Sequence, residues 1–148
     1  MNDQALTKTL DILKELISFE TVALTSNLDL ITYAEKYLSD LGAKVSLTHS
    51  PDGERANLFA SFGPEINGGI VLSGHSDVVP VNANDWTTPP FQADQRNDCI
   101  FGRGSADMKG FIACALAFAP IYSQTNLNRD IHFSFTFDEE TACLGAPI

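Results

Sequence analysis

Apolar residues repeat at intervals of three and four near the start of the chain. The stretch Asp3–Phe19 has this pattern, which is typical of the buried stripe of an amphipathic helix. A second such stretch covers Leu28–Leu41, where Ser26 or Asn27 can cap the first turn and Gly42 can end the last one. We therefore expect two helices in the first third of the chain.

Extended patterns come next. Ala43–Thr48 and Asn57–Phe62 are separated by the turn-rich segment His49–Gly53, which predicts a β-hairpin. Gly69–Leu72 is short and apolar, as a buried strand is, and Asp130–Phe137 alternates between apolar and polar residues. These patterns predict a sheet that is built from distant parts of the chain.

A less regular region separates the last two strands. Val79–Asp98 is rich in Pro, Asn and Asp and is expected to be irregular, whereas Cys99–Gly102 is expected to form a short strand. Lys109–Tyr122 is almost wholly apolar, which predicts a helix buried against a sheet. Helices and strands interleaved in this way predict an α/β sandwich with a mixed, mainly parallel sheet flanked by helices.

Composition narrows the class of protein. The chain has 148 residues, 44% of them hydrophobic, which is enough for one domain with its own core. Nineteen acidic and nine basic residues give a formal charge of −10, and such a surface repels nucleic acid and anionic lipid. Neither is therefore an expected partner.

The cysteines and the first residues of the chain indicate the cellular compartment. Met1–Thr9 has no basic cluster followed by an apolar run, so no export signal is expected. Cys99, Cys114 and Cys143 are odd in number and far apart, which favours reduced thiols, buried as small apolar residues, over disulfides. We expect a cytoplasmic protein.

The first candidate for chemistry follows a buried strand. His75 and Asp77 are two residues apart, so on extended backbone their side chains point the same way. Asp77 could orient His75 as a metal ligand, although an isolated pair of this kind is more often a strand-end histidine beside a solvated acid. A nucleophilic Ser76 is weaker still, because Val78 stands where the nucleophile elbow needs glycine.

Two further polar clusters follow strands. In the segment Gly102–Gly110, Asp107 occupies the place of the third glycine of a dinucleotide-binding loop, where its charge favours a cation over a phosphate. Asp138, Glu139 and Glu140 end the alternating strand and would repel one another without a cation, although a charge run of this kind is most often a solvated loop. One imidazole and several carboxylates at strand ends suit zinc or a similar divalent ion.

The order of these motifs resembles a known family. The motifs are G-H-S-D-V-V-P from Gly74, a W-x-x-x-P-F segment from Trp86, G-R-G-S-A-D-M-K-G from Gly102 and D-E-E-T from Asp138. Together they resemble the metallohydrolase family of acetylornithine deacetylase, succinyl-diaminopimelate desuccinylase, aminoacylase and glutamate carboxypeptidase. The last two motifs are most similar to acetylornithine deacetylase. The resemblance extends over essentially the whole chain.

The resemblance implies a role for each residue. His75 would bind a first metal ion, Asp77 would orient it, Asp107 would bridge two ions and Glu140 would bind the second. Glu139 would be the general base that takes a proton from metal-activated water. The implied cofactors are two divalent ions, zinc first and cobalt as an alternative. The family also implies a cis peptide bond between Asp107 and Met108.

The implied activity is removal of the acetyl group from N-acetyl-L-ornithine, with N-succinyl-diaminopimelate or another N-acyl amino acid as alternative substrates. Family members continue with another carboxylate ligand, a lid and dimerisation domain and a C-terminal histidine ligand. We therefore expect residues 1–148 to be the N-terminal part of a catalytic domain, inactive alone, from a homodimeric parent. A non-catalytic short paralogue, weak metal binder or partner subunit is the alternative that the sequence leaves open.

Overall fold

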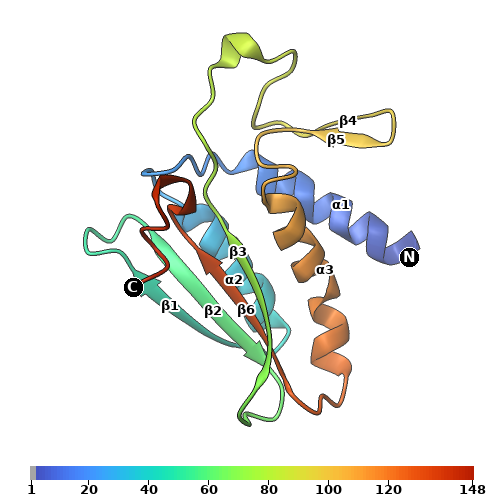
Figure 1. Ribbon diagram of the computed structural model, residues 1–148. Helices are drawn as coiled ribbons and strands as arrows, with labels where there is room; N and C mark the ends of the chain where they lie inside the picture. Colours follow the sequence, from blue (N-terminus) through green and yellow to red (C-terminus); the bar gives the residue numbers. More distant parts are fainter. Residues whose placement is uncertain (1–2) are drawn as a thin grey trace.

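A computed structural model describes residues 3–148, so Met1 and Asn2, which begin the stretch inspected for an export signal, lie outside it. The described residues form, in chain order, α1 (Asp3–Ser18), α2 (Leu28–Asp40), β1 (Lys44–His49), β2 (Ala56–Phe62), β3 (Gly69–His75), the 3-10 turn η1 (Ala83–Asp85), β4 (Asp94–Arg96), β5 (Cys99–Phe101), α3 (Lys109–Gln124), β6 (Asp130–Thr136) and the 3-10 turn η2 (Glu139–Thr141). Figure 1 shows β1, β2, β6 and β3 side by side, with the helices packed against them.

The sheet is mixed, as expected. Its order is β1-β2-β6-β3; β1 and β6 both run antiparallel to β2, and β3 runs parallel to β6. Three of the four strands, β1, β6 and β3, thus run in the same direction, and β2 opposes them because the short β1–β2 connection can only make an antiparallel pair. The parallel pair is joined through α3, as a crossover requires. We call the edge where β3 and β6 both end the carboxyl edge.

One face of the sheet carries the core. Along β2, Leu58 is buried while its neighbour Phe59 is 44% exposed, and in β6 Phe133 and Phe135 are buried on the same face as Leu58. This face packs against apolar side chains of all three α-helices, including Leu116 of α3. The expected alternation and the expected burial of the apolar helix are thus confirmed, and α3 begins near the carboxyl edge and runs back beside β3 (Figure 1).

Two details differ from the sequence expectation. The third strand continues through His75 rather than ending at Leu72, because pairing with β6 persists to Thr136. Within the stretch expected to be irregular, Asp94–Arg96 forms β4 and pairs with β5 as a small hairpin, in which Asn97 and Asp98 have positive φ. The sequence did not predict this strand, because its residues are polar and stand next to turn-forming residues.

The loop between α1 and α2 is hydrogen-bonded to the carboxyl edge. Asn27 does not cap α2; its side-chain amide instead donates to the main-chain oxygen of Ala56 and to the hydroxyl of Ser76 at 2.9 and 2.8 Å. Ser76 is fully buried and donates to the main-chain oxygen of Thr136 at 2.8 Å, which makes it a structural residue. Thr21 donates to the main-chain oxygen of Ser76 at 2.6 Å. These bonds hold the segment just after His75.

The cysteines are free, but the expectation that they are buried is wrong, since Cys99, Cys114 and Cys143 are all exposed. Cys99 begins β5 of the small hairpin, Cys143 lies in the turn after η2, and Cys114 lies on the exposed side of α3, so none of them faces the core. Within residues 3–148, no helix has the length and apolar character needed to span a membrane.

Candidate metal centre

His75 is the last residue of β3 and the centre of the cluster. Its side chain is 7% exposed, and its Nδ1 lies 2.9 Å from the main-chain oxygen of Asp77. The other ring nitrogen, Nε2, faces outward, 3.1 Å from an oxygen of Asp107 and 3.7 Å from one of Glu139. An Nδ1–H that donates to a carbonyl leaves Nε2 as the nitrogen available to a metal ion.

Asp77 connects His75 to the turn formed by Asp138, Glu139 and Glu140, which we call the acidic turn. Its carboxylate lies 3.5 Å from His75 Nδ1, farther than its own main-chain oxygen. The same carboxylate accepts hydrogen bonds from the backbone N–H groups of Glu139 and Glu140 at 3.0 and 3.1 Å. Asp77 therefore fixes the start of η2 as well as the imidazole, a task that the H-x-D spacing did not reveal.

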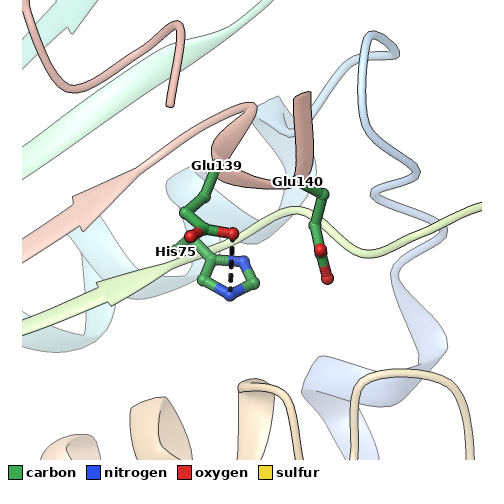
Figure 2. Close-up of side chains that lie close together, drawn as sticks. All are labelled: His75, Glu139 and Glu140. Atoms are coloured by element: carbon green, nitrogen blue, oxygen red, sulfur yellow. Dashed lines mark ion pairs between the residues drawn. The ribbon is translucent and has the colours of Figure 1, made fainter. Parts of the chain in front are cut away.

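The acidic turn projects its two glutamates on the outer side of His75. Asp138 adopts a left-handed conformation with φ 52° and ψ 40°, which turns the chain sharply after β6. In Figure 2 the Glu139 carboxylate lies over the imidazole of His75, with Glu140 beside it. One ligand atom from each of His75, Glu139 and Glu140 can be chosen so that all lie within 4.8 Å of one another. That spacing is compatible with a shared cation.

Asp107 approaches from the segment before α3. Its side chain is 77% exposed, and the Asp107–Met108 peptide bond is cis, as the resemblance implied. Met108 Sδ lies 3.3 Å from the backbone N–H of His75. The fully buried Lys109 donates from Nζ to the main-chain oxygen of Phe19 at 2.6 Å. This segment is thus fastened to the end of β3 on one side and to the end of α1 on the other.

The titration of these groups reflects their crowding. The Asp77 carboxylate raises the pKa of His75 to about 9, against the effect of burial. Burial by itself would raise the pKa of Asp77, but hydrogen bonds from His75 and the η2 backbone outweigh it and lower that pKa. Burial, followed by the charges of Asp107 and Glu139, raises the pKa of Glu140. The outer carboxylates therefore repel one another.

A divalent cation fits this donor set. An outward-facing imidazole nitrogen, whose proton a metal ion would displace, and carboxylates that repel one another are ligands that zinc takes in proteins. Within residues 3–148 the carboxylate of Glu140 accepts no hydrogen bond, so its oxygens are available as ligands. The group that meets within 4.8 Å includes Glu139 and not Asp107, although Asp107 touches His75.

All five residues singled out in the sequence thus lie at the carboxyl edge. The sequence did not indicate Arg55 and Asn57 of the β1–β2 hairpin region. The side chain of Arg55 bonds to Asp138 of the acidic turn, and that of Asn57 bonds to the backbone on either side of it. Arg55 is 83 residues away from its partner Asp138, and no local motif links them. Only the antiparallel pairing of β2 with β6 brings them together.

Known proteins match this chain in sequence. Residues 71–148, which include every residue of the cluster, match the Peptidase family M20/M25/M40. Acetylornithine deacetylase of Edwardsiella ictaluri is 38% identical over 122 residues, which are 82% of this chain and 32% of the relative. The chain therefore spans about a third of the length of that curated relative.

Solved structures agree in fold. Human carnosine dipeptidase 1 superposes with a TM-score of 0.79 at 24% identity, over 97% of this chain and 34% of that protein. An M20 family metallo-carboxypeptidase, Sso-CP2 from Sulfolobus solfataricus, gives a TM-score of 0.80 at 23% identity, over 94% of this chain and 32% of that protein. From the matched motifs and the shared fold, we conclude that the chain belongs to the Peptidase family M20/M25/M40.

Proposed function

We propose that the chain carries the metal-binding half of a catalytic centre that hydrolyses the amide bond of an N-acyl amino acid, with N-acetyl-L-ornithine as the first candidate substrate. The observation that carries this proposal is the meeting of His75, Glu139 and Glu140 within 4.8 Å, with Asp107 against the outer nitrogen of His75. The cluster lies beyond the ends of two parallel strands, where α/β sheets commonly place ligand sites.

The ligand roles follow from what each group faces. His75, through Nε2, and Asp107 would hold one divalent ion, and Asp107 with Glu140 a second, with zinc as the preferred metal and cobalt as a substitute. When bound, these ions would supply Lewis-acid activation of the amide carbonyl and of the attacking water. Asp77 would keep the imidazole in the tautomer that leaves Nε2 unprotonated.

Glu139 is our candidate for the proton-transferring group. Its side chain is 46% exposed and borders the outer nitrogen of His75, so a substrate and a water can both reach it. It would take a proton from the attacking water and give it to the leaving nitrogen as the C–N bond breaks. One water is consumed, and the products are acetate and the free amine of ornithine.

The choice of N-acetyl-L-ornithine as the first candidate substrate is based on sequence similarity to a relative. The relative from Edwardsiella ictaluri is named an acetylornithine deacetylase, and the match extends over 82% of this chain. N-succinyl-diaminopimelate and other N-acyl amino acids are the alternative substrates. We further propose a cytoplasmic location and a homodimeric full-length protein, with no nucleic acid or membrane partner.

The chain by itself should turn over little substrate. In the proposed arrangement each ion keeps two side-chain ligands from this chain, whereas zinc sites normally have three or four. The test is to follow cleavage of N-acetyl-L-ornithine by the 148-residue chain with added zinc or cobalt, beside a Glu139→Gln control, and then in a longer chain that carries this segment. Turnover in the longer chain that Glu139→Gln does not reduce would refute the role of Glu139 and the proposal with it.

A further inference from the structure

Two side chains outside the metal cluster hold the acidic turn in place: Asn57 of β2, and Arg55, the residue just before β2. Asn57 accepts a hydrogen bond from the backbone N–H of Phe137 at 3.2 Å and donates to the main-chain oxygen of Gly145 at 2.8 Å. It therefore ties together the two ends of the segment that carries Glu139 and Glu140. Asp138, the residue just before Glu139, is held by a different contact.

Arg55 makes that contact. Its Nη1 donates to Asp138 at 2.5 Å, and the Asp138 side chain is only 1% exposed. Its Nη2 donates to Asp52 in the hairpin turn at 2.6 Å, so the guanidinium is fixed at both ends. Asp138 also accepts the backbone N–H of Leu24 at 2.7 Å. Since Asp138 has the left-handed backbone that starts the turn, whatever fixes its side chain also fixes the direction of the next two residues.

We propose that Arg55 is a positioning residue of the metal centre, which acts through Asp138 to hold Glu139 and Glu140 where their carboxylates meet His75. This inference rests on the proposed function, because it assumes that these carboxylates serve a metal ion. Arg55 itself faces the inner side of the turn. Its guanidinium carbon lies over the ring of Phe137, 5.5 Å from the centre of that ring.

The direction in which metal affinity changes when Arg55 is replaced distinguishes a positioning role from a purely electrostatic one. If Arg55 acted only as a nearby positive charge, its removal would leave the site more negative and would strengthen the binding of a cation. If it positions the turn, its removal weakens binding, because the carboxylates lose their common orientation. Residues that orient metal ligands typically change metal affinity by about 10–100-fold.

Two variants and one control make the test. Arg55→Met removes the charge and both hydrogen bonds, while Arg55→Lys keeps the charge and can still donate to Asp138. Asp52→Asn is the control, since it weakens the other contact of Arg55 and leaves the Asp138 contact in place. Zinc affinity is measured by competition with a chromophoric chelator, and the cobalt-loaded proteins are compared by visible absorption, which reports the geometry around the ion.

We expect Arg55→Met to bind zinc about tenfold more weakly than the unchanged chain, with shifted cobalt bands. Arg55→Lys should lie between the two, and Asp52→Asn should match the unchanged chain in affinity and spectrum. If Arg55→Met does not fold, Arg55→Lys decides, and an affinity and spectrum equal to those of Asp52→Asn overturn the inference.

Equal or tighter zinc binding by a folded Arg55→Met also overturns the inference, and leaves the proposed function intact if Glu140→Gln still binds zinc more weakly. Failure of the unchanged chain to bind zinc would overturn the proposed function first and the positioning role with it.

Discussion

The acidic side chains at the carboxyl edge form two layers with opposite surroundings. In the inner layer, the side chains of Asp77 and Asp138 are 3% and 1% exposed. In the outer layer, those of Asp107 and Glu139 are 77% and 46% exposed, and Glu140 is partly exposed. The two layers come from the same motifs, and Asp138 is the direct neighbour of Glu139.

Hydrogen-bond donors account for the difference. Asp77 accepts two backbone N–H groups, and Asp138 accepts one backbone N–H and the guanidinium of Arg55. A buried carboxylate without such donors would cost several kcal/mol, so these two acids can only be part of the folded framework. The outer carboxylates face His75 and one another, and a cation would relieve their repulsion. The inner layer therefore holds the turn, and the outer layer is available for a ligand.

The largest predicted effect is on the inner layer. Asp138→Asn removes the charge that pairs with a guanidinium whose side chain is only 17% exposed, and breaking a mostly buried ion pair typically costs about 3 kcal/mol. Chemical denaturation should show a loss of that order in the free energy of unfolding. A loss below about 0.5 kcal/mol would mean that Asp138 behaves like an outer acid.

Asp77→Asn should have the next largest effect. An asparagine oxygen can accept one of the two η2 N–H groups, but its amide would face the other, so a loss of about 2 kcal/mol in unfolding free energy is expected. Zinc affinity should fall about 10–100-fold in the same variant, because the imidazole loses its orienting carboxylate. An unchanged zinc affinity would separate Asp77 from the metal centre.

The residues of the outer layer could be predicted from the sequence, whereas in the inner layer only the orienting role of Asp77 could. His75, Glu139 and Glu140 stand in recognisable motifs at the ends of β3 and β6, and the parallel pairing of these strands brings the ends together. Asp107 also stands in such a motif, but the segment before α3 carries it to His75. The second role of Asp77 depends on backbone N–H groups 62 and 63 residues away, which no spacing encodes.

The fold shows the same division. Periodic segments such as Asp130–Thr136 and α1 were predictable because burial on one face imposes a repeat on the sequence. The pairing order was not predictable, since it depends on which strands find each other across the chain. The strand Asp94–Arg96 was missed because it is short, polar and stabilised by a turn of its own.

The metal-free protein should lose stability between pH 6.5 and 8. The pKa of His75 is raised from 6.5 to about 9, so the folded state keeps a proton in this window that the unfolded state releases. The stabilisation is therefore complete below pH 6.5 and declines as pH rises, by about 1–2 kcal/mol up to pH 8. Above pH 8 the buried Lys109, whose pKa burial lowers to about 8, works in the opposite direction.

Denaturation in the presence of a chelator at several pH values measures this slope. The variant His75→Gln should lack it. A slope of the same size in that variant would assign the pH dependence to other groups.

The smallest effect is expected for Glu140→Gln without metal. The pKa of Glu140 is raised, first by burial and then by neighbouring carboxylates, so its charge is unfavourable in the folded state at neutral pH. Removing that charge should leave the free energy of unfolding unchanged or raise it by a few tenths of a kcal/mol, within the range usual for surface changes. A clear loss of stability would place Glu140 in the inner layer instead.

Zinc titration of three chains by calorimetry tests the two-layer account most directly. The chains are the unchanged protein, Glu140→Gln, and Glu65→Gln as a control that loses an exposed acid beside the opposite end of β6. We predict measurable binding by the unchanged chain, an affinity at least about tenfold lower for Glu140→Gln, and an unchanged affinity for Glu65→Gln. Equal affinities in all three chains, or no binding by any of them, would contradict a metal centre in the outer layer.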